Sequence, residues 1–273
     1  MALKDVSIGS YLPGSSLLHR LDPRAKLLLV IVYIVMLFLV SNPIGYVLVI
    51  GFLALAFAVA RIPMRLVLRS LKPIVPIIIL TSVLNIFFAV GADEPLVHWW
   101  IFTIYREGVL LAVSMAIRIL CLIAGTSLLT YTTTPISLTD GLEQLLSPLK
   151  KIKFPAHELS MMMTIALRFI PTLVEETDKI MSAQKARGAD LESGGLMQRV
   201  KALIPILIPL FVSAFRRADE LALAMECRCY RGGEGRTRLK QLRFRWADGF
   251  AFLFVAAILA GVVCINQFAP RFF

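Results

Sequence analysis

Charged residues are scarce in this chain: they make up 17% of its 273 residues, against about a quarter in a typical soluble domain. The four cysteines, Cys121, Cys227, Cys229 and Cys264, lie mostly apart and form no paired framework. The sequence also lacks a Gly-x-x-x-x-Gly-Lys-Ser/Thr loop, a Gly-x-Ser-x-Gly elbow and a His-Glu-x-x-His pair. These absences exclude a disulfide-stapled domain and the usual nucleotide, serine-hydrolase and zinc-protease sites, and no catalytic residue is expected.

Apolar residues, by contrast, are in excess. They make up 58% of the chain, and the mean hydropathy is +0.78, which is too high for a soluble core alone. The net charge is +11, from 29 Lys and Arg against 18 Asp and Glu. In a membrane protein such a surplus is first interpreted as marking the cytoplasmic segments, and only second as a sign of nucleic-acid binding. We therefore expect an integral membrane protein.

Several apolar runs approach the length of about 20 residues that a transmembrane helix needs. The sequence predicts an all-α integral membrane protein with about five transmembrane helices plus long amphipathic cytoplasmic coupling helices, which lie between the fourth and the fifth span. The first two runs are short and meet at a Ser-Asn-Pro turn. The five runs are Ala25–Ser41, Ile44–Ala60, Leu71–Val90, Gly108–Thr130 and Ala247–Phe268.

Basic residues are unevenly distributed between these runs. Residues 131–246 hold 18 Lys and Arg against 12 Asp and Glu, and the segment before the first run is also basic. Because basic segments stay in the cytoplasm, we expect the N-terminus inside and the C-terminus outside the cell membrane. The predicted domains are an N-terminal membrane domain of four spans (1–130), a cytoplasmic coupling-helix region (131–246) and a final transmembrane helix (247–273).

The cytoplasmic region is too apolar for a solvated linker. An apolar stripe at helical spacing runs through residues 162–180, with charged residues elsewhere on the same segment. Ala202–Phe215 is only 14 residues long and contains two prolines, so it suits a buried or interfacial helix better than a span. The pattern predicts a bundle of long amphipathic helices near the membrane face.

Two segments of this region align without gaps. Asp178–Gly188 and Asp219–Cys229 each carry an arginine nine residues after the aspartate, Arg187 and Arg228, at a predicted helix end. One interpretation is local: a cation near a helix C-terminus gains about 0.3–1 kcal/mol from the macrodipole. The other is that two similar helix ends contact two similar partner subunits, since the planar guanidinium can bind a carboxylate through two hydrogen bonds.

Four stretches carry a further pattern: Leu18–Lys26, Ala166–Pro171, Ala186-Arg187-Gly188 and Cys227–Gly233. Taken together, they resemble the transmembrane T component of energy-coupling factor (ECF) transporters. These are vitamin and metal importers of the ATP-binding-cassette (ABC) class. The resemblance runs nearly end to end, and two of the stretches are similar to the family's paired Ala-Arg-Gly motifs.

The resemblance implies a non-catalytic subunit that passes ATP-driven motion from two ABC-type ATPase subunits to a small membrane substrate-binding (S) subunit, for vitamin uptake across a bacterial cell membrane. It implies that ATP and Mg²⁺ are bound by the ATPase subunits, so that this chain has no cofactor of its own. In the second motif, cysteines replace the family's alanine and glycine, so its backbone need not match the first. The implied ATPase-coupling residues are Arg187, Arg228, Ala186, Gly188, Cys227 and Cys229.

Three other arginines are open to a structural or a functional interpretation. Arg118 lies mid-way along the fourth run, where a charge costs about 2.5–3.5 kcal/mol on insertion scales; Asp248 is its nearest candidate partner. Arg168 either anchors its helix at the lipid headgroups or contacts a partner, and Arg231 lies two residues after Cys229. A turn and a cytoplasmic anchor are sufficient to explain Asp22 and Arg24.

No metal site and no nucleic-acid partner are expected. The three histidines are scattered, and Cys227 and Cys229 supply two thiols where a structural zinc site needs four ligands. The basic tail Arg236–Arg245 directly precedes a span, so the anionic lipid of the bilayer is its expected counter-charge.

A self-contained secondary transporter is the alternative function. Such a protein is expected to show repeated or broken spans with paired ionisable residues at the midplane. The repeat in this sequence is cytoplasmic, which favours docking to partner subunits.

Overall fold

The structure, a computed structural model, describes residues 11–88, 97–99, 102–148, 154–189, 195–232 and 242–268. The chain divides into two compact units. The membrane unit comprises residues 9–142 and 242–273, and the long-helix unit comprises residues 1–8 and 143–241. Part of the predicted basic tail, with Arg236, Arg238 and Lys240, lies outside the described residues.

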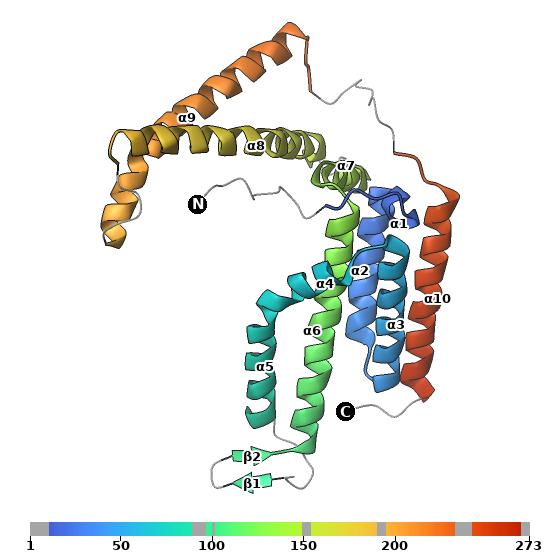
Figure 1. Cartoon of the computed structure of the whole chain (residues 1–273). Coiled ribbons are helices and arrows are strands. Elements are labelled where there is room, and N and C mark those ends of the chain that lie inside the picture. The colour runs from blue at the N-terminus through green and yellow to red at the C-terminus, as the bar shows by residue number, and fades with distance from the viewer. Residues whose placement is uncertain are drawn as a thin grey trace. The chain divides into compact units, whose positions relative to one another are not determined.

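The membrane unit is built from helices and one short hairpin (Figure 1). Its elements are α1 (Leu17–Arg20), α2 (Pro23–Leu39), α3 (Pro43–Ala60), α4 (Met64–Leu71), η2 (Lys72–Ile74), α5 (Val75–Phe88), β1 (Val97–Trp99), β2 (Phe102–Ile104), α6 (Arg106–Thr132), the first part of α7 (Pro135–Leu146) and α10 (Trp246–Phe268).

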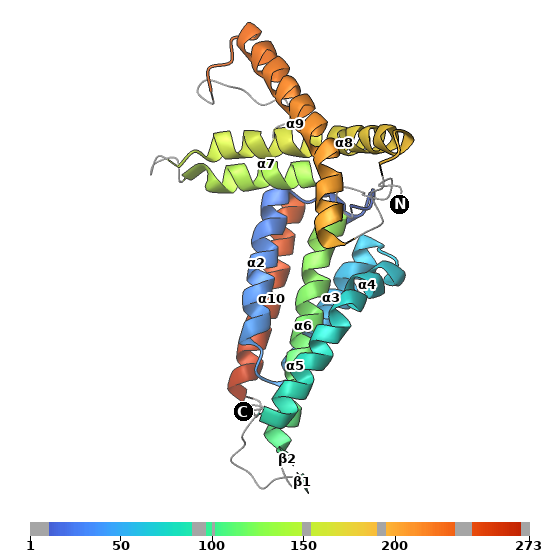
Figure 2. The same cartoon turned by 90° about the vertical axis from the view of Figure 1, so that its left-hand side faces the viewer.

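Four of these helices, α2, α3, α6 and α10, form a bundle (Figure 1, Figure 2). By length and composition, α3, α6, α10 and the segment Met64–Phe88 could cross a membrane. α2 has 17 residues, at the lower end of the range for a spanning helix. A helix therefore lies on each of the five predicted runs, and the prediction of a helical integral membrane protein is confirmed.

The third predicted run begins differently from the prediction. Helix α4 starts at Met64, ahead of the run, and α5 then proceeds in another direction (Figure 1). The 3-10 turn η2 separates the two helices and contains Pro73, whose missing N–H cannot continue an α-helical ladder. Between α5 and α6 the structure has an antiparallel pair of strands, with Val97 opposite Ile104.

The core of the bundle forms where α2 packs against α6. The Tyr33 hydroxyl donates a hydrogen bond to the Cys121 carbonyl at 2.7 Å, which satisfies the polar end of a buried aromatic side chain. Gly125, one turn further along α6, makes this approach possible: a Cβ at that position would lie 2.2 Å from Cε1 of Tyr33. The surrounding apolar side chains are Met36, Leu37, Val40, Val49, Leu53 and Val262.

The turn between α2 and α3 is tied to the end of α10. Asn42 is fully buried and donates to the Ile265 carbonyl at 3.3 Å, while the Asn266 amide donates to the Leu39 carbonyl. These bonds satisfy polar groups at helix ends, where the backbone ladder leaves carbonyls unpaired. The predicted Ser-Asn-Pro turn therefore lies at the same end of the bundle as the C-terminus of α10.

The long-helix unit contains the end of α7, α8 (Ala156–Ala186) and α9 (Leu196–Cys227), and α8 and α9 cross one another (Figure 1, Figure 2). The prediction of long cytoplasmic helices placed a short, separate helix at Ala202–Phe215, and that boundary was wrong. The run lies inside α9, which has 32 residues and contains Pro205 and Pro209 in its interior. Prolines bend a helix without ending it when the flanking turns remain hydrogen-bonded, and α9 bends along its length (Figure 2).

The contact between Tyr33 and Gly125 gives a first prediction. Replacing Gly125 with Ala should destabilise the protein by about 1–3 kcal/mol, because the added methyl group overlaps a buried ring. Gly51→Ala is the matched control: no atom lies within 4 Å of its added Cβ, so this change should be neutral or slightly stabilising in a helix. Thermal unfolding of the purified chain in detergent measures both, and equal melting temperatures would contradict the packing described.

Candidate functional site

Helix α8 ends at Arg187 in a closed hydrogen-bonded cap. Arg187 is the C-cap residue, and Gly188 follows it in the left-handed region with a φ of 81°. The Gly188 N–H donates to the Lys185 carbonyl at 3.0 Å and the Ala189 N–H donates to the Gln184 carbonyl at 3.0 Å. This pair of bonds is the Schellman motif, which satisfies carbonyls at a helix C-terminus.

Helix α9 ends at Arg228 with the same geometry. Cys229 occupies the left-handed position with a φ of 54°, and its N–H donates to the Glu226 carbonyl at 2.9 Å. The Tyr230 N–H donates to the Met225 carbonyl at 3.0 Å. Both bonds match those at the end of α8, so the replacement of glycine by cysteine leaves the backbone of the second motif unchanged.

Both caps leave their arginines exposed. Arg187 and Arg228 occupy equivalent C-cap positions, and their side chains have no ion-pair partner among the described residues. Ala186 and Cys227 are the last helical residues before them, and both are exposed. Each helix end therefore presents a guanidinium next to a fixed turn, which is suited to binding a carboxylate through two hydrogen bonds.

The crossing of α8 and α9 is held by polar contacts as well as by packing. Arg217 on α9 forms an ion pair with Glu176 on α8, and the hydrogen bond from Arg217 lowers the pKa of the Glu176 carboxyl below its ordinary value. Nearer the end of α8, the Gln184 side chain donates to the Pro205 carbonyl at 3.3 Å. Because Pro209 has no N–H to donate to the Pro205 carbonyl four residues earlier, this carbonyl accepts a hydrogen bond from α8 instead.

The residue after the second cap ties α9 back to the beginning of α8. The Tyr230 hydroxyl donates to Sδ of Met161 at 2.9 Å and lies 3.5 Å from Nε2 of His157. The other ring nitrogen of His157 lies 3.0 Å from Oε1 of Glu143. Sequence reasoning missed this cluster, because its members are separated by up to 87 positions and match no motif.

The other candidate arginines occupy different environments. Arg118 donates to the Val40 carbonyl at 3.1 Å and lies over the ring of Phe38, so its charge meets the C-terminal end of α2. It has no acidic partner among the described residues, and Asp248 is bonded elsewhere. Arg168, within α8, and Arg231, after α9, are both exposed.

A metal centre has no support in the described part of the chain. No group of three His, Cys, Asp or Glu side chains there could hold an ion. Cys227 and Cys229 are free and exposed.

Comparison with known proteins identifies the family. The family model described as CbiQ, cobalt transport protein, matches residues 14–239. The energy-coupling factor transporter transmembrane protein EcfT of Clostridium kluyveri is 55% identical over 265 residues, covering 97% of this chain and 96% of the relative. The chain belongs to the EcfT family.

Other EcfT proteins are similar over almost the same length. That of Acidaminococcus fermentans is 56% identical over 256 residues, 94% of this chain and 95% of the relative. That of Bacillus subtilis is 50% identical over 242 residues, with 88% and 91% covered. The chain is thus a transmembrane, non-catalytic component of an ECF transporter, and the resemblance drawn from its motifs is confirmed.

In this EcfT family member the stretch Leu18–Lys26 does more than form a turn and a cytoplasmic anchor. Asp22 caps α2: its carboxylate accepts hydrogen bonds from the Arg24 backbone N–H at 2.9 Å and from the Arg24 guanidinium. Burial raises the pKa of Asp22, but the hydrogen bonds from Arg24 outweigh it, so the pKa lies below its ordinary value. The capping carboxylate is therefore ionised at neutral pH.

The partner of this stretch is Asp248, at the beginning of α10. Asp248 is fully buried, and one carboxylate oxygen accepts the Asp22 N–H at 2.8 Å while the other accepts the Arg245 N–H at 2.7 Å. The second bond is the return half of a capping box, in which the third helical residue bonds the N-cap N–H. One carboxylate thus starts α10 and fastens it to the start of α2.

Asp248 gives a second prediction. Replacing Asp248 with Ala leaves two backbone N–H groups without their acceptor, so stability should fall by about 2 kcal/mol or more. Asp248→Asn keeps one acceptor oxygen and should lose less. Asp219→Ala, at an exposed position on α9, is the control and should change the melting temperature little. A wild-type melting temperature for Asp248→Ala would show that the hydrogen bonds of Asp248 do not stabilise the contact between α10 and α2.

The left-handed cysteine gives a third prediction. Cys229→Gly should stabilise the end of α9 by about 0.5–1 kcal/mol, because a Cβ is disfavoured at positive φ, while Gly188→Ala should destabilise the end of α8 by a similar amount. Hydrogen exchange at the last turn of each helix measures the two changes separately. Faster exchange in Cys229→Gly would show that the cap is formed differently.

Proposed function

We propose that this chain couples ATP hydrolysis by two ABC-type ATPase subunits to a membrane-embedded substrate-binding subunit. The observation that carries the proposal is the match between the two helix ends. Arg187 and Arg228 are exposed C-cap residues of equivalent Schellman turns, despite different neighbouring residues. Two like subunits require two like contact elements, and the match supports one ATPase subunit at each end.

The chemistry of docking follows from the caps. Each turn satisfies its own backbone carbonyls, so the guanidinium beside it remains available for a carboxylate in an ATPase groove. Ala186, Cys227 and Cys229 have short side chains and Gly188 has none, so the partner surface can approach the backbone beside each arginine closely. In this proposal ATP and Mg²⁺ are bound by the ATPase subunits, since this chain lacks a phosphate-binding loop.

The surface for the substrate-binding subunit is proposed on the long helices. The first two-thirds of α9 exposes large apolar side chains, and α8 adds Met162 and Met163, whose flexible thioethers adapt to different partners. Exposed apolar surface of this extent is typical of a protein or membrane contact. The residues on α9 include Met197, Val200, Leu203, Leu207, Phe211 and Phe215.

The proposed location is a bacterial cell membrane, with the N-terminus in the cytoplasm and the C-terminus outside. The surplus of basic residues in 131–246 supports this orientation. So does the bond between Asn42 and the end of α10, because it places the C-terminus of α10 at the opposite end of the bundle from the start of α2.

We also propose the functional division of the chain into 1–130, 131–246 and 247–273. The boundaries between the two compact units, near residues 142 and 241, support a coupling region between membrane segments. The substrate class proposed is a vitamin, which the substrate-binding subunit would select.

The fourth prediction tests the coupling ends. In Arg187→Ala/Arg228→Ala, each end loses a charge-assisted contact of about 1.5–3 kcal/mol, so co-purification of the ATPase subunits should fall by more than about tenfold. ATP-dependent vitamin uptake by proteoliposomes containing the assembled complex should fall to background.

Arg216→Ala is the matched control. Arg216 is also an exposed arginine on α9 but lies away from the caps, so this variant should assemble and transport like the wild type. Normal uptake by the double variant would refute the proposal, and equal loss in the control would assign the effect to general charge.

A further inference from the structure

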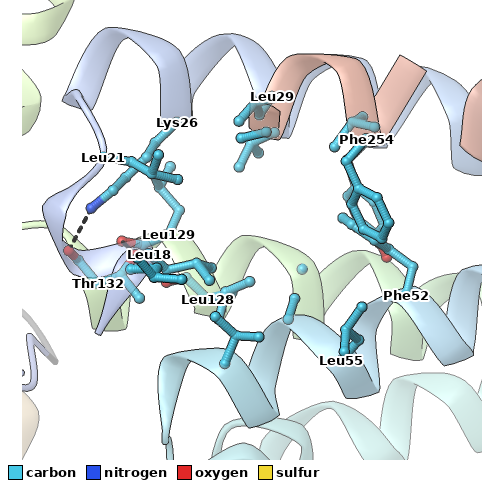
Figure 3. A pocket seen from close by; sticks show the side chains of 18 of the residues that line it. Leu18, Leu21, Lys26, Leu29, Phe52, Leu55, Leu128, Leu129, Thr132 and Phe254 are labelled. Atoms are coloured by element: carbon cyan, nitrogen blue, oxygen red, sulfur yellow. Dashed lines mark hydrogen bonds between the residues drawn. The ribbon is translucent and has the colours of Figure 1, made fainter. Parts of the chain in front are cut away.

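We propose that the membrane unit binds one acyl chain of a phospholipid in a cavity between α1, α2, α3, α6 and α10. The cavity has a volume of about 620 Å³, within the range of ligand pockets. Lys26 lies at one end and Phe52 and Phe254 lie at the other, with leucines between them (Figure 3). The two phenylalanine rings pack against each other at that end, with their centroids 6.0 Å apart.

Polar groups in the lining are already bonded within the protein. Lys26 has three N–H donors, and Nζ lies 2.8 Å from the Thr132 carbonyl, 3.2 Å from Oγ1 of Thr133 and 3.4 Å from the His19 carbonyl. The Tyr33 hydroxyl donates to the Cys121 carbonyl. A polar substrate would leave its own groups unpaired here, and a water molecule needs two to four polar partners. The lining therefore selects hydrocarbon.

Two of the side chains that line the cavity are also exposed on the outside of the bundle. Leu55 on α3 and Phe250 on α10 both line it, and they are 50% and 70% exposed. Because both helices are long and apolar enough to cross a membrane, their outer faces meet acyl chains. An acyl chain that enters beside Leu55 and Phe250 would meet apolar side chains there.

Basic residues lie at the Lys26 end of the cavity. Arg20 precedes Leu21 of the lining, Arg61 follows α3, and Arg245 precedes α10; all three are exposed. A phospholipid that places an acyl chain in the cavity would have its phosphate at the membrane surface near these side chains. Arginine binds phosphate through two hydrogen bonds, and several basic residues together attract a headgroup of net negative charge, so the proposed ligand is an anionic phospholipid.

The test blocks the cavity with side chains. Ala251 on α10 lines it, so Ala251→Phe should fill part of the space and exclude about two methylene groups. Native mass spectrometry of the full-length chain, purified in mild detergent containing dioleoyl phosphatidylglycerol, should show one tightly bound lipid per wild-type chain. The variant should retain about tenfold less lipid.

Two further variants separate cavity filling from misfolding. Ala56→Leu fills the same space from α3 and should also lose the lipid, and Ala257→Phe, at an exposed position of α10 outside the lining, should retain it. Monodisperse elution of each variant on gel filtration establishes that it is folded. Retention of lipid by both filled variants, or binding of detergent alone by the wild type, would overturn the proposal.

Discussion

A single buried carboxylate fixes where the membrane bundle begins. Burying an ionisable group away from water is unfavourable unless it is hydrogen-bonded. Asp248 meets this condition by accepting one N–H from the start of α2 and one from its own helix start. The last helix of the chain is thereby fastened to the first long one, 226 positions earlier. The same two helices line the cavity with α1, α3 and α6, and Asn42 bonds the end of α10 at the far end of the bundle.

The sequence was sufficient for the helices on the five apolar runs. It was insufficient for α4 ahead of the third run, for the hairpin of β1 and β2, and for the way the helices join. Long apolar runs predict helices because backbone groups inside lipid must be hydrogen-bonded within the chain. The predicted start of α10 at Ala247 lies one residue from the observed start at Trp246. The contacts of Asp22 and Lys26 were not predictable, because their partners on α10 and at the end of α6 are distant in sequence. The local pattern of the stretch explains only the cap of α2.

At the candidate site, the sequence predicted two helix ends and left the second backbone open. Glycine after Arg187 signals a left-handed turn, whereas cysteine after Arg228 carries no such signal; the repeat alone pointed to equivalence. The boundary at Ala202–Phe215 was wrong because proline lowers helix propensity locally, while packing against α8 supports a continuous helix. Propensity is a weak guide where tertiary contacts decide.

The bond from Tyr230 to Met161 means that α8 is engaged at both of its ends. One end carries Arg187, and the other is held by the residue that follows the Arg228 cap. α8 has 31 residues, so it is roughly 46 Å long at 1.5 Å per residue. In the proposed complex, a movement of the ATPase subunit at Arg228 would be transmitted through Tyr230 to the start of α8. The other ATPase subunit would act on the opposite end of the same helix, at Arg187. The two ATPase subunits would then act on one shared element from opposite ends, although their docking turns are alike.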